Sequence, residues 1–259
     1  MRDFEGKTVV ITGAAGGQGS AEARLFAEHG AHVVLADLNA EKGNALAQEM
    51  AQADLPAEFA SLDVASATAW EELRTRLERR GGALDVLINN AGTAHRFGLM
   101  ETSLERFNEV LAINLAGPFL GMKTLAPLMR DSGGGSMVNI GSAAGMTGHF
   151  SAAYSSSKWG LRGLSKVAAM EFAPWKIRVN SIHPGIVNTA LVPGDTSFPA
   201  AMTKYTPMGR PAEPSDIAPV ALFLASDASS FMTGADLNVD GGLVDIGVYD
   251  AVAKEYARS

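Results

Sequence analysis

A chain of 259 residues, with 47% hydrophobic and 19% charged residues, has the size of one globular domain, and its net charge of -7 argues against a nucleic-acid partner. The absence of cysteine excludes disulfides and thiolate metal sites, and the five histidines show no ligand spacing. No apolar leader or run of about eighteen apolar residues is evident, so we expect a cytoplasmic protein without a metal site or a membrane partner.

Short apolar, β-branched runs alternate along the chain with helical patterns. The predicted strands are 8–12, 32–37, 58–62, 86–89, 137–140, 178–183 and 236–239. The predicted helices are 20–29, 41–53, 67–79, 104–129, 152–172 and 215–225. Such alternation indicates βαβ units with right-handed crossovers. We therefore expect an α/β fold for residues 1–259, a single-domain, Rossmann-type doubly wound sheet of about seven parallel strands with helices on both faces.

Two segments depart from this regular pattern. Residues 190–208 contain three prolines among scattered apolar residues, and long irregular segments in compact domains are usually lids or binding loops. We expect this segment to be a substrate loop. Residues 243–259 form a C-terminal tail with several apolar side chains, which we expect to close over an active site within an oligomer.

A glycine-rich turn follows the first strand and leads into the first helix. Its residues are Gly13, Ala14, Ala15, Gly16, Gly17, Gln18 and Gly19. Glycines allow a tight turn and a close approach of the backbone to a pyrophosphate at the positive end of a helix. A glycine cluster alone is also typical of an ordinary turn, but its place between a strand and a helix favours a dinucleotide site.

Asp37 ends the second strand, at the offset of about 20 residues where dinucleotide-binding folds place a ribose-binding acid. Its carboxylate would accept a hydrogen bond from the adenosine 2′-hydroxyl and repel a 2′-phosphate. Neither Ala15 nor Leu38 supplies a compensating cation. Asp37 could instead only cap the next helix, although Asn39 is available for that role. We therefore expect NAD, in preference to NADP, as the cofactor.

Tyr154 and Lys158 are four residues apart at the start of a predicted helix, which places the phenol and the ammonium group on one face. The cation would stabilise a phenolate and bring the tyrosine pKa toward the working range of an acid/base. Ser142 follows a strand at the carboxyl edge of the sheet, where its hydroxyl could bind a carbonyl oxygen or only form a turn. Asn114 lies within a helical run, where it could interrupt the helix, order water near Lys158 or face solvent.

Together these residues resemble the short-chain dehydrogenase/reductase family. The resemblance extends in order from about Gly6 to Gly242. It rests on Thr12-Gly13-x-x-x-Gly17-x-Gly19, Asp63-Val64, Asn89-Asn90-Ala91-Gly92, Asn114, Ser142, Tyr154-x-x-x-Lys158 and Pro184-Gly185. Two positions depart from the family pattern, because Gln18 stands where isoleucine or leucine is usual and Gly141 stands where serine is frequent.

The resemblance implies a catalytic tetrad in which Tyr154 is the acid/base, Lys158 binds the nicotinamide ribose, Ser142 binds the carbonyl and Asn114 holds a relay water. The implied cofactor contacts beyond the glycine turn and Asp37 are Leu38, Asp63, Val64, Asn90, Ala91, Gly92, Pro184, Gly185, Val187 and Thr189. Members of the family are usually homotetramers built through the long helices that correspond here to 104–129 and 152–172.

Four stretches, at 121–124, 155–163, 183–185 and 207–210, resemble bacterial 3α/20β-type hydroxysteroid dehydrogenases. The expected pocket lining is Ala144, Gly145, Met146, His149, Phe150, Leu191, Val192, Phe198 and Met202. This mainly apolar lining favours an apolar, cyclic or steroid-like secondary alcohol as a small-molecule partner, although the same side chains could only pack the loop. His149 could bond a polar group of the substrate or could be an ordinary surface histidine.

Two other kinds of function stay open. A 3-oxoacyl-carrier-protein reductase or a sugar dehydrogenase of the same family would share the catalytic residues. The former normally uses NADPH and needs a basic surface for its acidic carrier, which Asp37 and the charge of -7 argue against. A catalytically silent NAD-binding regulator would have no use for Tyr154 and Lys158 together. The sequence therefore favours NAD-dependent interconversion of an alcohol and a ketone.

Overall fold

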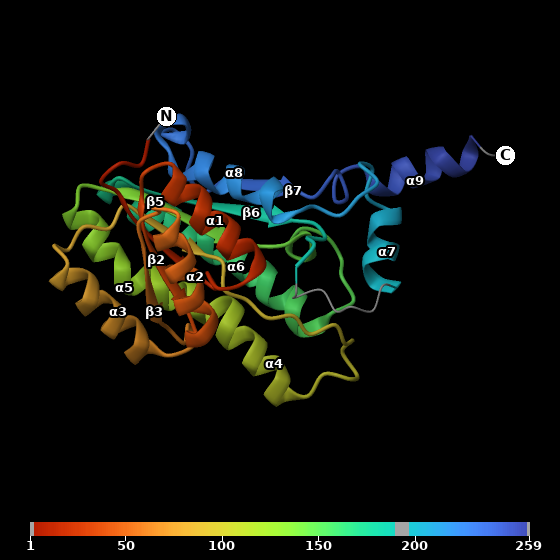
Figure 1. Cartoon of the computed structure of the whole chain (residues 1–259). Coiled ribbons are helices and arrows are strands. Elements are labelled where there is room, and N and C mark those ends of the chain that lie inside the picture. Colours follow the sequence, from red (N-terminus) through yellow and green to blue (C-terminus); the bar gives the residue numbers. More distant parts are fainter. Residues whose placement is uncertain (1–2, 190–196, 258–259) are drawn as a thin grey trace.

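The computed structural model describes residues 3–189 and 197–257, which build one seven-stranded sheet (Figure 1). All paired strands are parallel, in the order β3-β2-β1-β4-β5-β6-β7. The strands are β1 (Thr8–Thr12), β2 (His32–Asp37), β3 (Ala57–Ser61), β4 (Val86–Asn89), β5 (Gly135–Ile140), β6 (Ile177–Pro184) and β7 (Asp236–Val239). The predicted Rossmann-type sheet is confirmed, and the predicted strands agree with the observed ones to within one or two residues.

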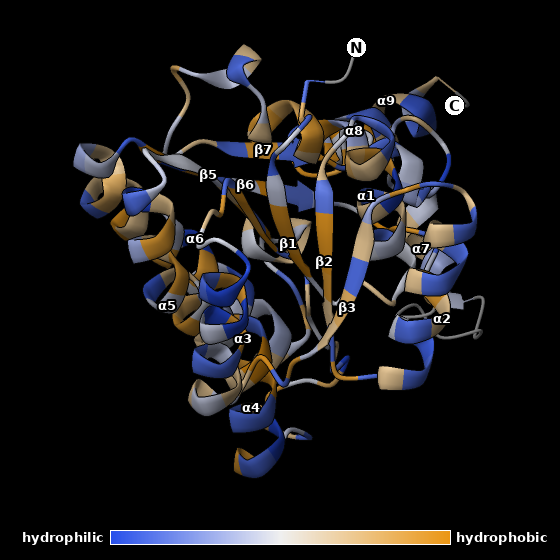
Figure 2. Cartoon of the chain, turned by 60° about the vertical axis from the view of Figure 1, so that its left-hand side comes forward, coloured by the Kyte–Doolittle hydropathy of each residue, from blue (hydrophilic) through white to orange (hydrophobic). Residues whose placement is uncertain are grey.

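Helices cover both faces of the sheet (Figure 2). They are α1 (Gly17–Glu28), α2 (Ala40–Gln52), α3 (Ala67–Arg79), α4 (Leu104–Leu111), α5 (Gly117–Asp131), α6 (Ala152–Phe172), α7 (Ser197–Lys204), α8 (Pro214–Ala225) and α9 (Gly247–Tyr256). Adjacent strand residues point to opposite faces, so Val10 packs in the core under α3, α5 and α6, whereas Val9 and Ile11 pack under α1, α2 and α8. Burial on both faces explains why the strands are continuous apolar runs.

The strand order reverses between β1 and β4. β1 pairs with β2 on one side and with β4 on the other, so the connections that follow these two strands diverge at the carboxyl edge. Open α/β sheets bind their ligands in the crevice outside such a switch point. The turn after β1 and the segment after β4 therefore face the region where a ligand is expected.

The predicted helix 104–129 is not continuous. A π-helical turn, Ala112–Ala116, separates α4 from α5 and contains the fully buried Asn114. Single π-helical turns of this kind are frequent at functional sites. The combined run Leu104–Asp131 is long and apolar enough to cross a membrane, contrary to the expectation that no such run exists, but α5 packs against α3, α6 and the central strands as a core helix does.

Two further elements differ from the sequence expectation. The segment 190–208, predicted to be irregular, contains α7, and the tail 243–259 contains α9. Both helices are short, with eight and ten residues, and expose much of their surface. Figure 1 shows α9 extending away from the body of the molecule beyond α7.

Candidate active site

The turn between β1 and α1 is held in a shape that only glycine permits. Gly13 has a φ of 65°, and a Cβ placed there would lie 2.8 Å from the Ala91 Cα atom. A Cβ on Gly19 would collide with the Gly13 carbonyl oxygen. Two glycines therefore serve the packing of the turn itself against the segment after β4.

The N-terminus of α1 fits the pyrophosphate of a dinucleotide. Its N-cap is Gly16, which makes no side-chain capping hydrogen bond, and the first turn contains no acidic residue. The amides of Gly17, Gln18 and Gly19 thus begin the helix without a carboxylate or hydroxyl to satisfy them. Such a helix end presents partial positive charge to an anion.

Asp37 ties the end of β2 to the glycine turn. Its Oδ2 accepts a hydrogen bond from the Ala15 amide at 3.0 Å, and its Oδ1 accepts one from the Asn39 amide at 2.8 Å. Helix α2 is capped by Asn39, whose side chain accepts from the Lys42 amide, so Asp37 is not the helix cap. The carboxylate lies beside an exposed Leu38, which carries no charge to neutralise an added phosphate.

Asn90, which was expected only to contact the cofactor, also makes hydrogen bonds that hold the glycine turn. Its Nδ2 donates to the carbonyl oxygens of Thr12 (3.0 Å) and Gly13 (3.2 Å). The Thr12 hydroxyl in turn accepts from the amides of Asn90 (3.1 Å) and Ala91 (3.0 Å). Sequence reasoning gave Thr12 no role, but this hydroxyl joins the carboxyl ends of β1 and β4. Together these hydrogen bonds hold the carboxyl ends of β1 and β4 in place at the switch point.

The other predicted cofactor residues lie around the same crevice. Exposed Asp63 accepts from the Ala65 amide at 2.9 Å, and buried Val64 packs near Gly117 at the start of α5. On the opposite side, Thr189 lies beside the start of α1, because a Cβ on Gly17 would be 3.2 Å from the Thr189 Cγ2. The segment that follows β6 therefore returns to the helix end that fits the pyrophosphate.

Buried Asn114 organises the polar network beneath the predicted catalytic residues. Its Oδ1 accepts from the Thr93 amide at 2.8 Å, and its Nδ2 donates to the Thr93 carbonyl oxygen (2.9 Å) and to the Ser157 hydroxyl (3.1 Å). The side chain is thus engaged with the segment after β4 and with α6. Ser157, which the sequence reading did not single out, donates from its hydroxyl to the Tyr154 carbonyl oxygen at 2.7 Å.

Tyr154, Lys158 and Ser142 converge at the carboxyl end of β5. The Ser142 side chain lies close enough to the Tyr154 phenol to lower its pKa, and the Lys158 ammonium lies 5.8 Å from the Tyr154 ring centroid. Lys158 Nζ donates to the Ile140 carbonyl oxygen at 2.8 Å, and the residue is only 4% exposed. The side chains predicted to form the tetrad are therefore brought together from β5, α6 and the π-helical turn.

Burial acts on both titratable groups of this cluster. It lowers the pKa of Lys158 to about 8, since an ammonium group loses its hydration there. It also raises the pKa of Tyr154 above its ordinary value, although the Ser142 hydrogen bond and the Arg96 charge both oppose that rise. The expected lowering of the tyrosine pKa by the Lys158 cation is not found, because desolvation of the phenol outweighs the opposing contacts.

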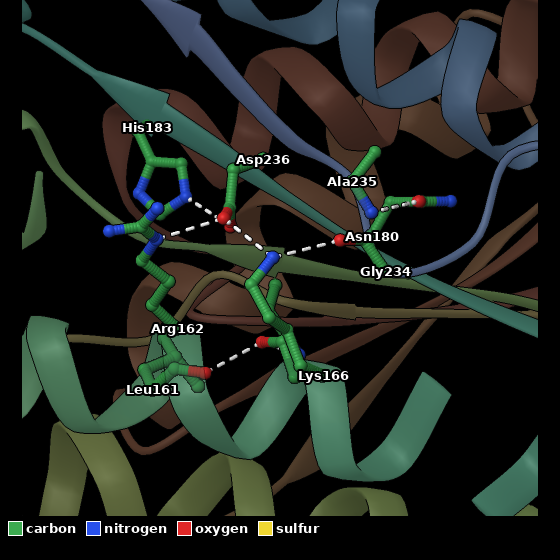
Figure 3. Close-up of polar contacts among 10 residues, drawn as sticks. Leu161, Arg162, Lys166, Asn180, His183, Gly234, Ala235 and Asp236 are labelled. Atoms are coloured by element: carbon green, nitrogen blue, oxygen red, sulfur yellow. Dashed lines mark hydrogen bonds and ion pairs between the residues drawn. The ribbon is translucent and has the colours of Figure 1, made fainter. Parts of the chain in front are cut away.

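A cluster of charges holds α6 in place against the sheet (Figure 3). Asp236, at the start of β7, accepts from Arg162 Nε (2.8 Å), pairs with Lys166 Nζ (2.7 Å) and contacts His183 Nε2 (3.0 Å). Burial works to raise the pKa of Asp236, but hydrogen bonds from these partners prevail and hold it at about 2. The middle of the helix that carries Tyr154 and Lys158 is thus joined to Asp236 at the start of β7.

His183 also explains one departure from the family pattern. It is fully buried on β6, and a Cβ at Gly141 would collide with its ring. Burial lowers the pKa of His183, so the ring is neutral near pH 7. The ring therefore occupies the space that a larger residue than Gly141 would need, just before Ser142.

The predicted substrate wall is only partly as expected. Ala144 is buried, and its carbonyl oxygen accepts from the Ser155 hydroxyl at 2.8 Å, which ties the Ser142 loop to α6. His149 stacks on Phe150 at 4.6 Å and lies 6.4 Å from the Tyr154 ring. Leu191, which we assigned to the substrate, and Val192 lie outside the described residues. Arg96 was missed, although its guanidinium lies 4.9 Å from the Phe198 ring on this same wall.

A cavity of about 970 Å³ lies at the other edge of the sheet, lined by residues such as Asp85, Gly135, Lys176 and Arg178. These residues stand at the amino ends of β4, β5 and β6, far from the convergence of Tyr154 and Lys158. Among residues 3–189 and 197–257, no group of three or more metal-binding side chains is found. We therefore place the candidate site by its chemistry, at the carboxyl edge.

Comparisons with known proteins agree with this geometry. A family profile described as enoyl-(acyl carrier protein) reductase matches residues 13–244. Trans-4-hydroxycyclohexanecarboxylate dehydrogenase of Sinomonas cyclohexanicum is 43% identical over 91% of this chain and 92% of its own length. The 3-alpha-(or 20-beta)-hydroxysteroid dehydrogenase of Mycobacterium tuberculosis is 38% identical over 92% of this chain and 90% of its own.

Solved structures agree as well. A Beutenbergia cavernae protein assigned as an NAD(P)-dependent gluconate 5-dehydrogenase, with NADP bound at low occupancy, superposes with a TM-score of 0.88. The two chains are 35% identical, and the match covers 94% of this chain and 98% of that one. With the family profile, the relatives and this structure in agreement, the chain is an oxidoreductase that belongs to the short-chain dehydrogenase/reductase family.

Proposed function

We propose that this protein is an NAD-dependent dehydrogenase that interconverts an apolar, cyclic secondary alcohol and its ketone, with Tyr154 as the acid/base. The observation that carries the proposal is the convergence of the Tyr154 phenol with the Ser142 side chain and the buried Lys158 ammonium. This group lies at the carboxyl edge of the sheet, across the crevice from a helix end that fits a pyrophosphate.

Each residue has a distinct task in alcohol oxidation. Bound NAD would supply the acceptor for the hydride that leaves the carbinol carbon. Tyr154 takes the hydroxyl proton as the carbon–oxygen bond becomes a carbonyl, and in reduction it returns a proton to that oxygen. Ser142 donates a hydrogen bond to the substrate oxygen and stabilises the negative charge that develops on it. Asn114 holds the segment after β4 and the first turns of α6 in register.

The pKa values of Tyr154 and Lys158 favour a role for the bound dinucleotide in proton transfer. Burial leaves the Tyr154 phenol protonated near pH 7, because its pKa is raised. Burial also weakens the Lys158 cation, since its pKa is about 8. A positively charged nicotinamide would lower the pKa of the Tyr154 phenol, and a ribose oxygen that accepts a hydrogen bond from Lys158 would favour its ammonium form. Proton transfer is therefore expected to depend on prior binding of the cofactor.

The carboxylate of Asp37 is expected to set the preference for NAD. Replacing Asp37 with asparagine keeps the acceptor oxygen but removes the charge that repels a 2′-phosphate. We expect the ratio of kcat/KM with NADP to kcat/KM with NAD to rise about 10- to 100-fold, which corresponds to about 1.5–3 kcal/mol for a hydrogen bond to a charged group. Steady-state kinetics with both cofactors measures this, and an unchanged ratio would remove Asp37 from the discrimination.

The substrate class follows from the wall beside Tyr154 and from the relatives. His149, Phe150 and Phe198 present rings on this side, and ring contacts of this kind suit a cyclic, apolar substrate. The two relatives described above are named for a hydroxycyclohexane and a hydroxysteroid substrate, both of which are cyclic secondary alcohols. NADH formation from a panel of cyclohexanols, steroid alcohols and acyclic polyols tests the proposal, and turnover confined to the polyols would contradict it.

A carrier-protein reductase is the second candidate, because the matching family profile is described by that activity. Two observations weigh against it. Asp37 disfavours the phosphate of NADPH, and a net charge of -7 disfavours docking of an acidic carrier. A catalytically silent regulator is disfavoured because Ser142, Tyr154 and Lys158 are assembled together.

We also propose a homotetramer, in which α4, α5 and α6 form subunit contacts and the tail covers an active site. Support comes from exposed apolar side chains on these elements, namely Leu104, Phe119, Trp159, Val167, Met170, Val248 and Val252. Isolated apolar side chains are common on a surface, but groups on neighbouring helices are typical of an interface.

A single NAD-binding domain and a cytoplasmic location stay predictions from the sequence and its cysteine-free composition.

A further inference from the structure

A fully buried ring, His183, lies beside the strand end that carries Ser142 and has no task in the chemistry described above. The pairing of β5 with β6 places it there, because Ile140 lies opposite Ile182 in the register of the two strands. One residue further, the Gly141 amide donates to the Ile182 carbonyl oxygen at 2.7 Å. His183 is therefore the neighbour of Gly141 across the sheet, one residue before Ser142.

The His183 ring occupies the space that a side chain at Gly141 would need. A Cβ on Gly141 would collide with the ring Nδ1, so the ring rests directly on the glycine backbone. Burial lowers the pKa of His183, and the nearby Ser142 backbone is among the groups that oppose this lowering. Because a glycine has no side chain of its own to pack, the ring supports the end of β5 just before Ser142.

Asp236 fixes the way in which the ring lies (Figure 3). Its Oδ1 is 3.0 Å from His183 Nε2, so the neutral ring carries its proton on Nε2 and presents an unprotonated Nδ1 to Gly141. Within residues 3–189 and 197–257, this Nδ1 makes no hydrogen bond of normal geometry. An apolar side chain would fill the same space without leaving a buried acceptor unpaired, so packing alone does not account for the histidine.

The carboxylate that holds the ring also holds the helix of the acid/base. Asp236 Oδ2 lies 2.8 Å from Arg162 Nε and 2.7 Å from Lys166 Nζ, and both cations belong to α6. These two cations already neutralise Asp236, so His183 is not needed for that purpose. Asp236 therefore connects the helix that carries Tyr154 with the ring that supports the strand end before Ser142.

We propose that His183, held by Asp236, is a positioning residue that keeps the Ser142 hydroxyl against the Tyr154 phenol. It acts through the backbone of Gly141 and Ser142, because its own ring is fully buried. The inference rests on the proposed function, in which Ser142 stabilises the charge that develops on the substrate oxygen. A displacement of about 1 Å at a catalytic group can cost about 10²-fold in rate, so loss of the ring should lower kcat.

A double-mutant cycle between His183 and Ser142 tests the inference. His183→Ala should lower kcat for oxidation of a cyclic alcohol about 10- to 100-fold and leave KM for NAD within a few-fold of the wild type. In the Ser142→Ala background, the same substitution should cost about 2-fold or less, because the hydroxyl that it positions is gone. His183→Gln should keep part of the activity, since its amide can still donate to Asp236. Lys166→Gln is the matched control, because it removes a partner of Asp236 on α6 and should leave kcat intact.

A measurement on Tyr154 itself separates this inference from the proposed function. Ser142 works to lower the pKa of Tyr154, so a displaced Ser142 should let that pKa rise. In protein labelled with ¹³C at tyrosine Cζ, the Tyr154 resonance can be assigned among the four tyrosines by its absence in Tyr154→Phe. Titration of the NAD-bound protein should give a higher pKa in His183→Ala and in Ser142→Ala, with no further rise in the double variant.

The possible outcomes distinguish the two claims. Losses of kcat that multiply across the cycle, or a Tyr154 pKa that rises in Ser142→Ala but not in His183→Ala, would overturn the inference while alcohol oxidation stands. No turnover of any cyclic alcohol by the wild type, with the Tyr154 pKa still raised in His183→Ala, would overturn the proposed function instead. If His183→Ala does not fold, His183→Gln replaces it in both experiments, with smaller changes in the same directions.

Discussion

Replacing Tyr154 with phenylalanine is expected to lower kcat for alcohol oxidation by about 10²- to 10⁴-fold, the range that a positioned acid/base contributes. The substitution removes only the hydroxyl that Ser142 contacts and leaves the ring beside Lys158. The phenol is needed in both directions, because one direction takes a proton from the reacting oxygen and the other returns it. Steady-state kinetics with a cyclic secondary alcohol and NAD measures the loss.

Two controls distinguish lost chemistry from lost structure. NAD binding by the Tyr154→Phe variant should stay within a few-fold of the wild type, because the pyrophosphate end of the site lies on α1. Ser156→Ala, an exposed change two residues further along the same helix, should leave kcat intact. A Tyr154→Phe variant that oxidises the alcohol at the parent rate would mean that another group moves the proton.

Replacing Glu22 with glutamine is expected to remove a large contribution that lowers stability as pH rises between about 4.5 and 8, and that opposes the contribution of the buried histidines. Glu22 is fully buried in α1, and burial raises its pKa to about 8, while the Gln18 amide that donates to it at 3.1 Å works in the other direction. Its ordinary pKa is 4.5, so in this window the folded protein holds a proton that the unfolded chain has lost. Stability therefore falls as pH rises through the window, by about 5 kcal/mol at 1.4 kcal/mol per pH unit.

Denaturant unfolding at pH 5 and pH 8.5 measures this difference. Between these two pH values the wild type should lose several kcal/mol of unfolding free energy relative to Glu22→Gln, which keeps the contribution of the histidines but lacks the buried carboxyl. Glu41→Gln, at an exposed position on α2, should keep the wild-type difference. If the wild type and Glu22→Gln change in parallel between the two pH values, the buried carboxyl is not the cause.

The sheet was predictable because its strands are buried on both faces and read as apolar runs separated by helical patterns. The order of strands and helices along the chain then allows few sheet topologies with right-handed crossovers. Asn114 was the only indication of the π-helical turn in the sequence. The geometry of the turn depends on hydrogen bonds between Asn114 and residues of other segments, Thr93 and Ser157. Helices α7 and α9 were missed because both are short, and because the prolines near α7 indicate irregular structure in the sequence.

At the site too, features set by spacing along the chain could be predicted, whereas features set by contacts between distant elements could not. Tyr154 and Lys158 could be paired from their spacing on one helix, and Asp37 could be placed from its distance to the glycine turn. The Tyr154 pKa was misjudged because a spacing shows the neighbour but not the loss of hydration, which here is the larger effect. Arg96 could not be found, since the contact between its segment and the start of α6 joins positions more than fifty residues apart.

The most direct test of the account follows the hydrogen on the carbinol carbon. A cyclic secondary alcohol deuterated at that carbon should pass its deuterium to the nicotinamide ring of NAD, one deuterium for each ketone formed, as read by mass spectrometry of the reduced cofactor. The Tyr154→Phe variant should do the same at a much lower rate. Ketone formed with the deuterium lost to water, or no ketone from any cyclic alcohol despite bound NAD, would contradict hydride transfer at this site.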